Sequence, residues 1–231
     1  MIFYTGMHLP YLVKYLDKAF VSVNVLKKRR SDFEVGDWIM DSGAFTEIST
    51  HGYYRNGVEE YAEYINRWST CGNMELAVAQ DYMCEPFILE KTGLSVEHHQ
   101  VLTIQRYREL LQYTNHPIMP VLQGFSIEDY LVHLEMYGGL LGSHVRVGVG
   151  SVCKRNSNPR VIATILEAIK MKRPDLRLHG FGIKYTALQN NYVCSLLYSA
   201  DSMAWSFAAR KEGRDPNSVE EALSYTDKVN N

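Results

Sequence analysis

The sequence predicts an α/β fold in which parallel strands form a barrel, and three observations support this prediction. Short apolar or β-branched segments alternate with longer segments of helical character along the chain. The 231 residues, of which 46% are hydrophobic, suit one domain over residues 1–231 with a large core. Carboxylates and glycines recur where the apolar segments end, as expected for a site at one end of a parallel barrel.

The predicted strands are short and mostly apolar, as is typical of strands buried on both faces. They cover residues 1–5, 20–25, 37–41, 75–80, 117–122, 144–149, 176–181 and 197–202. The predicted helices cover residues 10–17, 58–70, 95–113, 126–137, 157–172, 184–193 and 217–229. Ser126 with Asp129 resembles a capping box, and Asn158-Pro159 places a proline in the first turn of the next helix.

Eight such βα units would close a TIM-type (β/α)8 barrel. The connection 26–36 has little room for a full helix, so we expect a compact barrel that is irregular near the N-terminus. An open doubly wound sheet is the alternative.

The composition of the chain says little about its function, and the residues at the strand ends say more. The net charge is only −2, but basic residues cluster at 27–30, 154–160, 170–173 and 210–214, which leaves a phosphate-binding surface open. The four cysteines lie too far apart in sequence for a zinc-ligand or redox pattern. No apolar stretch approaches the roughly 20 residues of a membrane span, and no secretory leader is visible. We therefore expect no metal, no cofactor, no membrane contact and a cytoplasmic location, in the host if the chain is phage-encoded.

Three carboxylates stand at the ends of predicted strands. Asp41 follows the apolar run 38–40, Asp81 follows 76–79, and Asp201 lies in the last strand. We expect them to share one pocket, because the carboxyl ends of parallel barrel strands meet at one end. Paired carboxylates suit chemistry at a glycosidic carbon, one as nucleophile and one as acid/base.

Other strand ends offer groups that suit a flat ligand. An amide such as that of Gln123, together with a carboxylate, could read the edge of a purine, while an aromatic ring stacks on its face. Glycines at 148 and 150 would let the backbone approach the ligand closely. No Ser-His-Asp order, Walker-type phosphate loop or His/Asp metal cluster occurs among these residues.

These segments, in their order along residues 38–210, resemble the tRNA-guanine transglycosylase superfamily. The chain is most similar to the phage and bacterial DNA 7-deazaguanine transglycosylases of the DpdA type. The matching segments are Asp41-Ser42-Gly43-Ala44-Phe45, Gln80-Asp81-Tyr82-Met83-Cys84-Glu85-Pro86, Pro120-Val121-Leu122-Gln123-Gly124, Val147-Gly148-Val149-Gly150-Ser151, Leu178-His179-Gly180-Phe181-Gly182 and Ala200-Asp201-Ser202-Met203-Ala204-Trp205.

The resemblance implies a TIM barrel that exchanges guanine in a nucleic acid for a free 7-deazaguanine base. It assigns Asp201 as the nucleophile, Asp41 as general acid/base, and Asp81 and Gln123 as readers of the purine edge. Phe45 would stack on the base, and backbone at Gly148, Val149 and Gly150 would close the pocket. His179 stands where the tRNA enzymes have a Met that contacts the base, so it is a further candidate for base contact.

The polymer is expected to be DNA. The zinc insertion and the appended RNA-binding domain of the tRNA enzymes have no counterpart in this sequence. Lys154, Arg155 and Arg210 follow two of the site strands and are candidates for phosphate contacts. A homodimer is left open. The alternatives are a tRNA-guanine transglycosylase with the same chemistry, a retaining glycosidase, and a nucleic-acid-binding module that has lost the chemistry.

Overall fold

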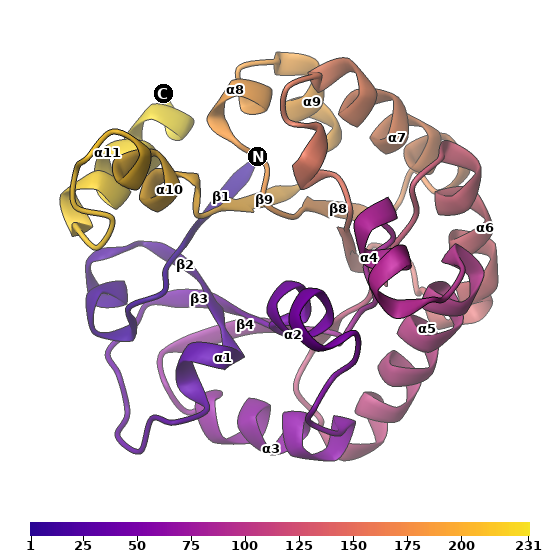
Figure 1. Cartoon of the computed structure of the whole chain (residues 1–231), viewed down its shortest axis with the longest axis horizontal. Coiled ribbons are helices and arrows are strands. Elements are labelled where there is room, and N and C mark those ends of the chain that lie inside the picture. The colour runs from indigo at the N-terminus through magenta and orange to yellow at the C-terminus, as the bar shows by residue number, and fades with distance from the viewer.

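The computed structural model describes all residues, 1–231, and contains a parallel barrel with helices around it (Figure 1). All strand pairs are parallel, in the order β5-β4-β3-β2-β1-β9-β8-β7-β6. The strands are β1 Ile2–Gly6, β2 Lys18–Ser22, β3 Asp37–Asp41, β4 Asn73–Val78, β5 Ile118–Met119, β6 Val121–Leu122, β7 Arg146–Val149, β8 Arg177–Gly180 and β9 Ser199–Ser202. The predicted fold class, an α/β barrel of the TIM type, is confirmed.

Pro120 divides the predicted strand 117–122 into β5 and β6, and the barrel closes there. Proline has no backbone N–H, so it interrupts a strand ladder. The carbonyl of Met119 accepts a hydrogen bond from the Ala79 N–H at 3.0 Å, whereas the carbonyl of Pro120 accepts one from the Gly148 N–H at 2.9 Å. One short segment therefore joins β4 to β7.

Helices cover the outside of the barrel. The α-helices are α1 Val23–Leu26, α2 Ala44–His51, α3 Val58–Trp68, α4 Pro86–Thr92, α5 Val96–Tyr113, α6 Ile127–Tyr137, α7 Pro159–Lys172, α8 Tyr185–Leu188, α9 Asn191–Leu196, α10 Ala204–Lys211 and α11 Val219–Asn230. Three 3-10 helices, η1 Pro10–Tyr15, η2 Gly138–Leu140 and η3 Cys153–Arg155, lie in connections. The predicted capping box of Ser126 and Asp129 is present at the start of α6.

Three predicted elements are wrong in detail. The second strand is Lys18–Ser22 rather than 20–25, because the Ser22 side chain accepts a hydrogen bond from the Asn24 N–H and starts α1. Val23 and Val25 are β-branched, which by itself favours a strand. The predicted helix 184–193 is two helices, because the Asn190 side chain caps a new helix, α9. Residues 10–17 form the 3-10 helix η1 and not an α-helix.

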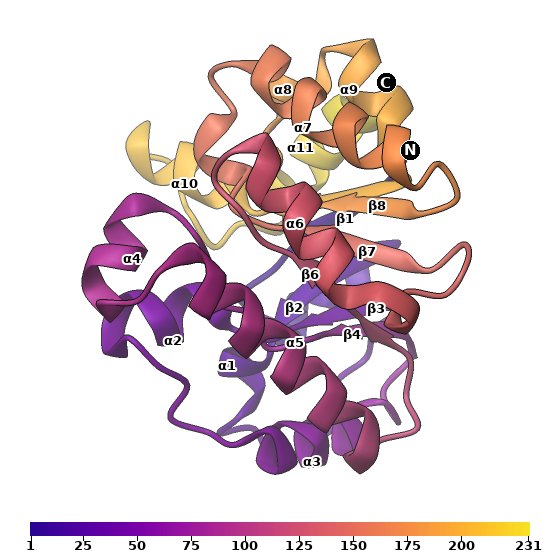
Figure 2. The same ribbon diagram turned by 90° about the vertical axis from the view of Figure 1, so that its right-hand side faces the viewer.

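Helices α2, α4 and α10 were not predicted, and all three lie beyond the carboxyl ends of the strands (Figure 2). A small apolar cluster that includes Ala44, Ile48, Tyr82 and Ile88 joins α2 and α4 to the segment after β4. Helices α2 and α4 therefore build up one wall of the barrel mouth.

The core has two layers. A cluster of 48 buried residues fills the space between strands and helices, and a cluster of six buried residues fills the barrel interior. The interior cluster consists of Tyr4, Phe20, Ile39, Val78, Met119 and Val121. Because side chains fill the barrel interior, a ligand cannot enter the barrel beyond its mouth.

An ion-pair network closes the N-terminal end of the barrel. Glu75 accepts hydrogen bonds from the Tyr4 hydroxyl at 2.7 Å and from the Lys18 ammonium at 3.2 Å, and it pairs with Arg146 at 3.2 Å. Lys18 also pairs with Asp37. Glu75 and Asp37 at this end therefore each face a cation.

Candidate active site

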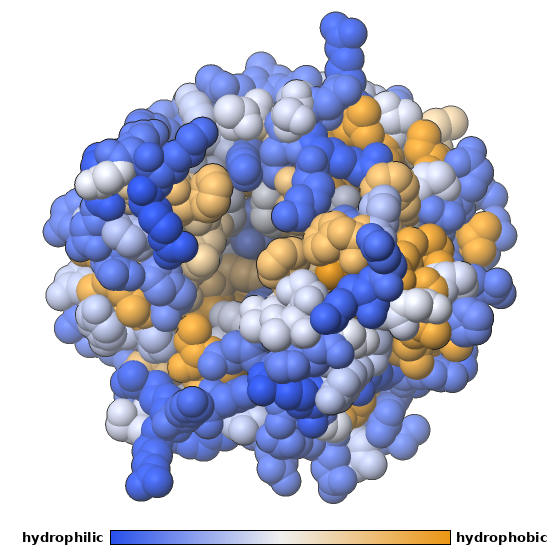
Figure 3. Space-filling view, in the orientation of Figure 1, coloured by the Kyte–Doolittle hydropathy of each residue, from blue (hydrophilic) through white to orange (hydrophobic).

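A cavity of about 410 Å³ opens at the carboxyl ends of the strands. Figure 3 looks onto this mouth and shows a hollow near its centre, bordered by hydrophobic residues. Six of the residues predicted from the sequence line the cavity: Asp41, Phe45, Asp81, Gln123, Gly150 and Asp201. The parallel barrel thus brings together residues that are up to 160 positions apart.

Asp41, the last residue of β3, is held by a tight turn. The Gly43 N–H donates to Asp41 Oδ2 at 3.0 Å, and the Asn24 amide donates to the Gly43 carbonyl at 3.3 Å. Gly43 has φ +75°, and a Cβ there would come within 2.3 Å of the Asn24 amide nitrogen, so only glycine fits. Burial, helped by the negative charge of Asp201, raises the pKa of Asp41 to about 6.

Asp81 begins a chain of hydrogen bonds in the cavity wall. It accepts a hydrogen bond from the Gln123 amide nitrogen. Gln123 Oε1 accepts from the Ser151 hydroxyl at 2.8 Å, and the same hydroxyl lies 2.8 Å from Glu85 Oε2. Burial raises the pKa of Asp81 to about 7, against the lowering effect of the bond from Gln123.

Gly150 is required for this chain. Its missing side chain leaves room for the Gln123 amide, which a Cβ at position 150 would approach to within 2.1 Å. The Tyr130 hydroxyl donates to the Gly150 carbonyl at 2.7 Å and fixes the strand end. Substitution of Gly150 would therefore displace Gln123.

Asp201 in β9 is held in place by hydrogen-bond donors and not by a lysine or arginine. Its Oδ1 accepts from the Gly182 N–H at 3.1 Å and lies 3.3 Å from His179 Nε2. Because a carboxylate can only accept, the His179 proton lies on Nε2, and Nδ1 accepts from the Ser199 hydroxyl at 2.8 Å. These contacts hold the second carboxylate in one orientation.

The sequence of the chain is similar to that of a known protein family. The sequence model of the family described as "DpdA: DeoxyPurine in DNA protein A" matches residues 1–228. The chain belongs to the DpdA family. A comparison with curated proteins found no match.

Membership in the DpdA family confirms the resemblance to the DNA 7-deazaguanine transglycosylases within the tRNA-guanine transglycosylase superfamily. It supports a transglycosylase that acts on DNA in deazapurine modification. No helix in the structure is long and apolar enough to cross a membrane.

Three of the predicted base-contacting residues do not line the cavity of this DpdA-family chain. Gly148 lies under Phe181, whose ring a Cβ at position 148 would approach to 2.3 Å. Val149 is fully buried in the core between strands and helices. His179 is also fully buried; it stacks on Phe20 and reaches the cavity only through its contact with Asp201.

The predicted phosphate contacts lie at or near the rim. Lys154 Nζ is 5.2 Å from the centre of the Phe45 ring and 5.6 Å from that of Phe87. The Arg155 guanidinium lies 4.6 Å from the centre of the Phe125 ring and donates to the Phe125 carbonyl. Arg210 is exposed in the last turn of α10. None of the three lines the cavity itself.

Sequence analysis missed several residues of the cavity wall. His8 lies just after β1; its ring stacks on Trp205, and its Nε2 is 2.8 Å from Asn217 Oδ1. Its Nδ1 is buried without a partner. The only signal in the sequence was its place after the first strand. Glu85 stood inside one of the matching segments but had no assigned role.

No group of three or more His, Cys, Asp or Glu side chains is arranged to hold a metal ion, and all four cysteines are free. Burial raises the pKa of the cavity-lining Cys153 to about 11, so its thiol stays protonated at neutral pH. Independence from metal stays a prediction.

Proposed function

We propose that this DpdA-family chain exchanges guanine in DNA for a free 7-deazaguanine base through a covalent glycosyl intermediate on Asp201. The observation that carries the proposal is the pairing of Asp41 and Asp201 in one cavity, close enough that the charge of Asp201 raises the pKa of Asp41. Two carboxylates with different environments suit two different roles.

In the first step an Asp201 oxygen attacks C1′ of the nucleotide while the bond from C1′ to N9 of guanine breaks. The bonding electrons leave with the base, and Asp41 delivers a proton to a ring nitrogen, so guanine departs as a neutral molecule. A carboxyl group with a pKa of about 6 is a suitable acid near neutral pH. The Gly182 N–H and His179 keep the Asp201 oxygen oriented.

In the second step the incoming base takes the place of guanine. The Asp41 carboxylate removes the N9 proton of the 7-deazaguanine, N9 attacks C1′, and the ester bond to Asp201 breaks. Two successive displacements retain the configuration at C1′. No atom is gained or lost beyond the exchanged base, so no further reagent is needed.

Recognition of the base falls to Asp81, Gln123 and Phe45. A carboxylate can accept from N1–H and the 2-amino group of a guanine, and the Gln123 amide can donate to O6. The Phe45 side chain is 50% exposed at the rim, which leaves it free to stack on a base. His179 acts here as a positioning residue for Asp201.

The DNA strand would run across the rim, where Lys154, Arg155 and Arg210 contact phosphates. Extruding guanine from a duplex costs a few kcal/mol, which the phosphate contacts and the purine pocket offset. The test is exchange of labelled guanine into matched DNA and tRNA in one buffer. We expect incorporation into DNA; incorporation into tRNA alone would contradict DNA as the polymer and leave the base-exchange chemistry standing.

A further inference from the structure

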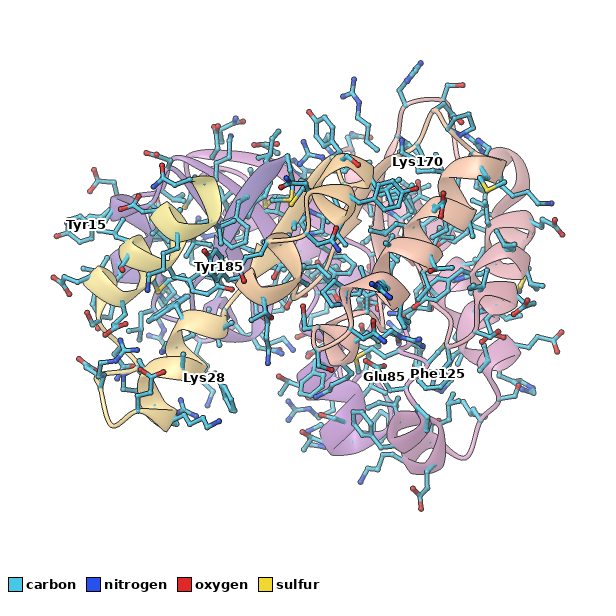
Figure 4. All side chains as sticks on the ribbon, turned by 90° about the horizontal axis from the view of Figure 1, so that it is seen from above. Tyr15, Lys28, Glu85, Phe125, Lys170 and Tyr185 are labelled. Atoms are coloured by element: carbon cyan, nitrogen blue, oxygen red, sulfur yellow. The ribbon has the colours of Figure 1, made fainter.

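Glu85 is a buried carboxylate in the cavity wall that the proposed chemistry does not use. Glu85 is only 2% exposed and directly precedes α4 (Figure 4). It is one of the residues that line the cavity. Its Oε2 lies 2.8 Å from the Ser151 hydroxyl oxygen, and its Oε1 lies 4.0 Å from Cys153 Sγ.

No lysine, arginine or histidine lies within 4.0 Å of the Glu85 carboxylate. The rim cation Lys154 lies instead beside the Phe45 and Phe87 rings. A buried carboxylate without a cation is unfavourable, since desolvation is not offset by an opposite charge. A positively charged group on the ligand would supply that charge.

The position of Glu85 in the hydrogen-bond chain indicates which part of a base it would meet. The chain runs from Asp81 through Gln123 and Ser151 to Glu85. Along the edge of a 7-deazaguanine the order is N1–H with the 2-amino group, then O6, then the substituent on C7. With Asp81 on the first group and Gln123 on O6, Glu85 comes opposite the C7 substituent.

We infer that Glu85 selects an incoming 7-deazaguanine whose C7 substituent is cationic, a primary ammonium or an amidinium, over one whose substituent is neutral. The inference rests on the proposed function, because it assumes base exchange in this cavity. It concerns only which base enters, and the proposed chemistry is the same for either.

The test compares 7-aminomethyl-7-deazaguanine, which is cationic, with 7-cyano-7-deazaguanine, which is neutral, as bases for incorporation into guanine-containing DNA. We expect the unaltered protein to favour the aminomethyl base by about tenfold or more in kcat/KM, as is usual for a buried hydrogen bond to a charged group. Glu85→Gln should bring that ratio close to one. Glu90→Gln, an exposed change of the same kind in α4, should keep it.

Calorimetric titration of each free base provides a readout that does not need turnover. Glu85→Gln should lose affinity for the aminomethyl base and not for the cyano base. A preference of the unaltered protein for the cyano base, or an unchanged ratio in a folded Glu85→Gln, would overturn the inference while leaving base exchange intact. Failure of the unaltered protein to exchange labelled guanine into DNA would instead overturn the proposed function.

Discussion

The two ends of the barrel differ in whether their carboxylates are paired with cations. At the N-terminal end Glu75 lies between Lys18 and Arg146, and the contact with Lys18 and Asn73 lowers the pKa of Asp37. At the mouth, Asp41 and Asp81 face no lysine or arginine within 4.0 Å, and burial raises the pKa of both.

This difference separates stability from chemistry. Because its pKa is lowered, Asp37 at the closed end favours the folded state above its ordinary pKa and loses that contribution as the pH falls. Mouth carboxylates with raised pKa values lower stability as the pH rises, but they can hold or release protons near neutral pH. One end of the barrel therefore supports the fold, and the other keeps reactive groups at some cost in stability.

The largest expected effect is at Asp201. Asp201→Ala should reduce base exchange by several orders of magnitude, because a methyl group cannot act as the nucleophile. Labelled-guanine exchange measures the loss, and circular dichroism with thermal melting checks that the barrel is intact. Near-normal exchange by the folded variant would refute the assignment.

Asp41→Asn should also stop turnover, by about 10²- to 10⁴-fold, because an amide cannot take up or deliver the proton. If the first step still occurs slowly, the incoming base cannot be deprotonated, and a covalent adduct with DNA accumulates. Denaturing gels of the variant with a guanine-containing strand would detect it, with Asp201→Ala as the control that forms none. Normal turnover would mean that Asp41 serves only the turn at Gly43.

Asp81→Asn should stabilise the protein at alkaline pH. The pKa of Asp81 is raised to about 7 from an ordinary value of 3.8. Below about pH 4 the carboxyl group is protonated in both states, and between about pH 4 and 7 the unfolded chain ionises first, so the folded state loses stability. The variant escapes this loss, on the order of a few kcal/mol above pH 7.

Thermal melting from pH 4 to pH 8 measures this effect. The difference in Tm between Asp81→Asn and the unaltered protein should grow with pH, while the exposed change Asp227→Asn in α11 shows no such trend. A variant that is less stable at pH 8 would show that the bond from Gln123 outweighs the burial of the charge.

At the opposite end, Glu75→Ala should destabilise the fold by about 1 to 3 kcal/mol, because it leaves Lys18 and Arg146 without their shared carboxylate. Urea denaturation measures the loss, and kcat/KM of the folded variant should change little. A strong loss of exchange activity without loss of stability would break the division between the two ends.

The smallest effect is expected at the rim. Lys154→Ala with Arg155→Ala should weaken DNA binding a few-fold and reduce the slope of log affinity against log salt by roughly one for each lost phosphate contact. Fluorescence anisotropy with a labelled strand measures the slope. Arg108→Ala, an exposed change on α5, should leave it as it is. An unchanged slope in the double variant would place the DNA elsewhere.

The carboxylate-bearing mouth could be predicted without coordinates. Asp41, Asp81 and Asp201 each stand at or near the end of an apolar run. All strands of a parallel barrel point the same way, so the parallel order of the strands is enough to place the three carboxylates at one end. The helix starts at Ser126 and at Asn158-Pro159 could also be predicted, because caps and first-turn prolines act within a few residues of the chain.

Tertiary structure alone decided the rest. The sequence could not show that Pro120 divides a strand at the point of closure, because that depends on which neighbours the two halves bond to. Nor could it show that Gly148 lies under Phe181 while Gly150 makes room for Gln123, because which neighbour a strand residue meets depends on how the strands pack together. Many elements together bury Asp41 and Asp81, and this desolvation raises the pKa of both. The same packing buries Glu85 without a cation. The sequence by itself determined which groups gather at the mouth, and packing determined which of them face the cavity and in what protonation state.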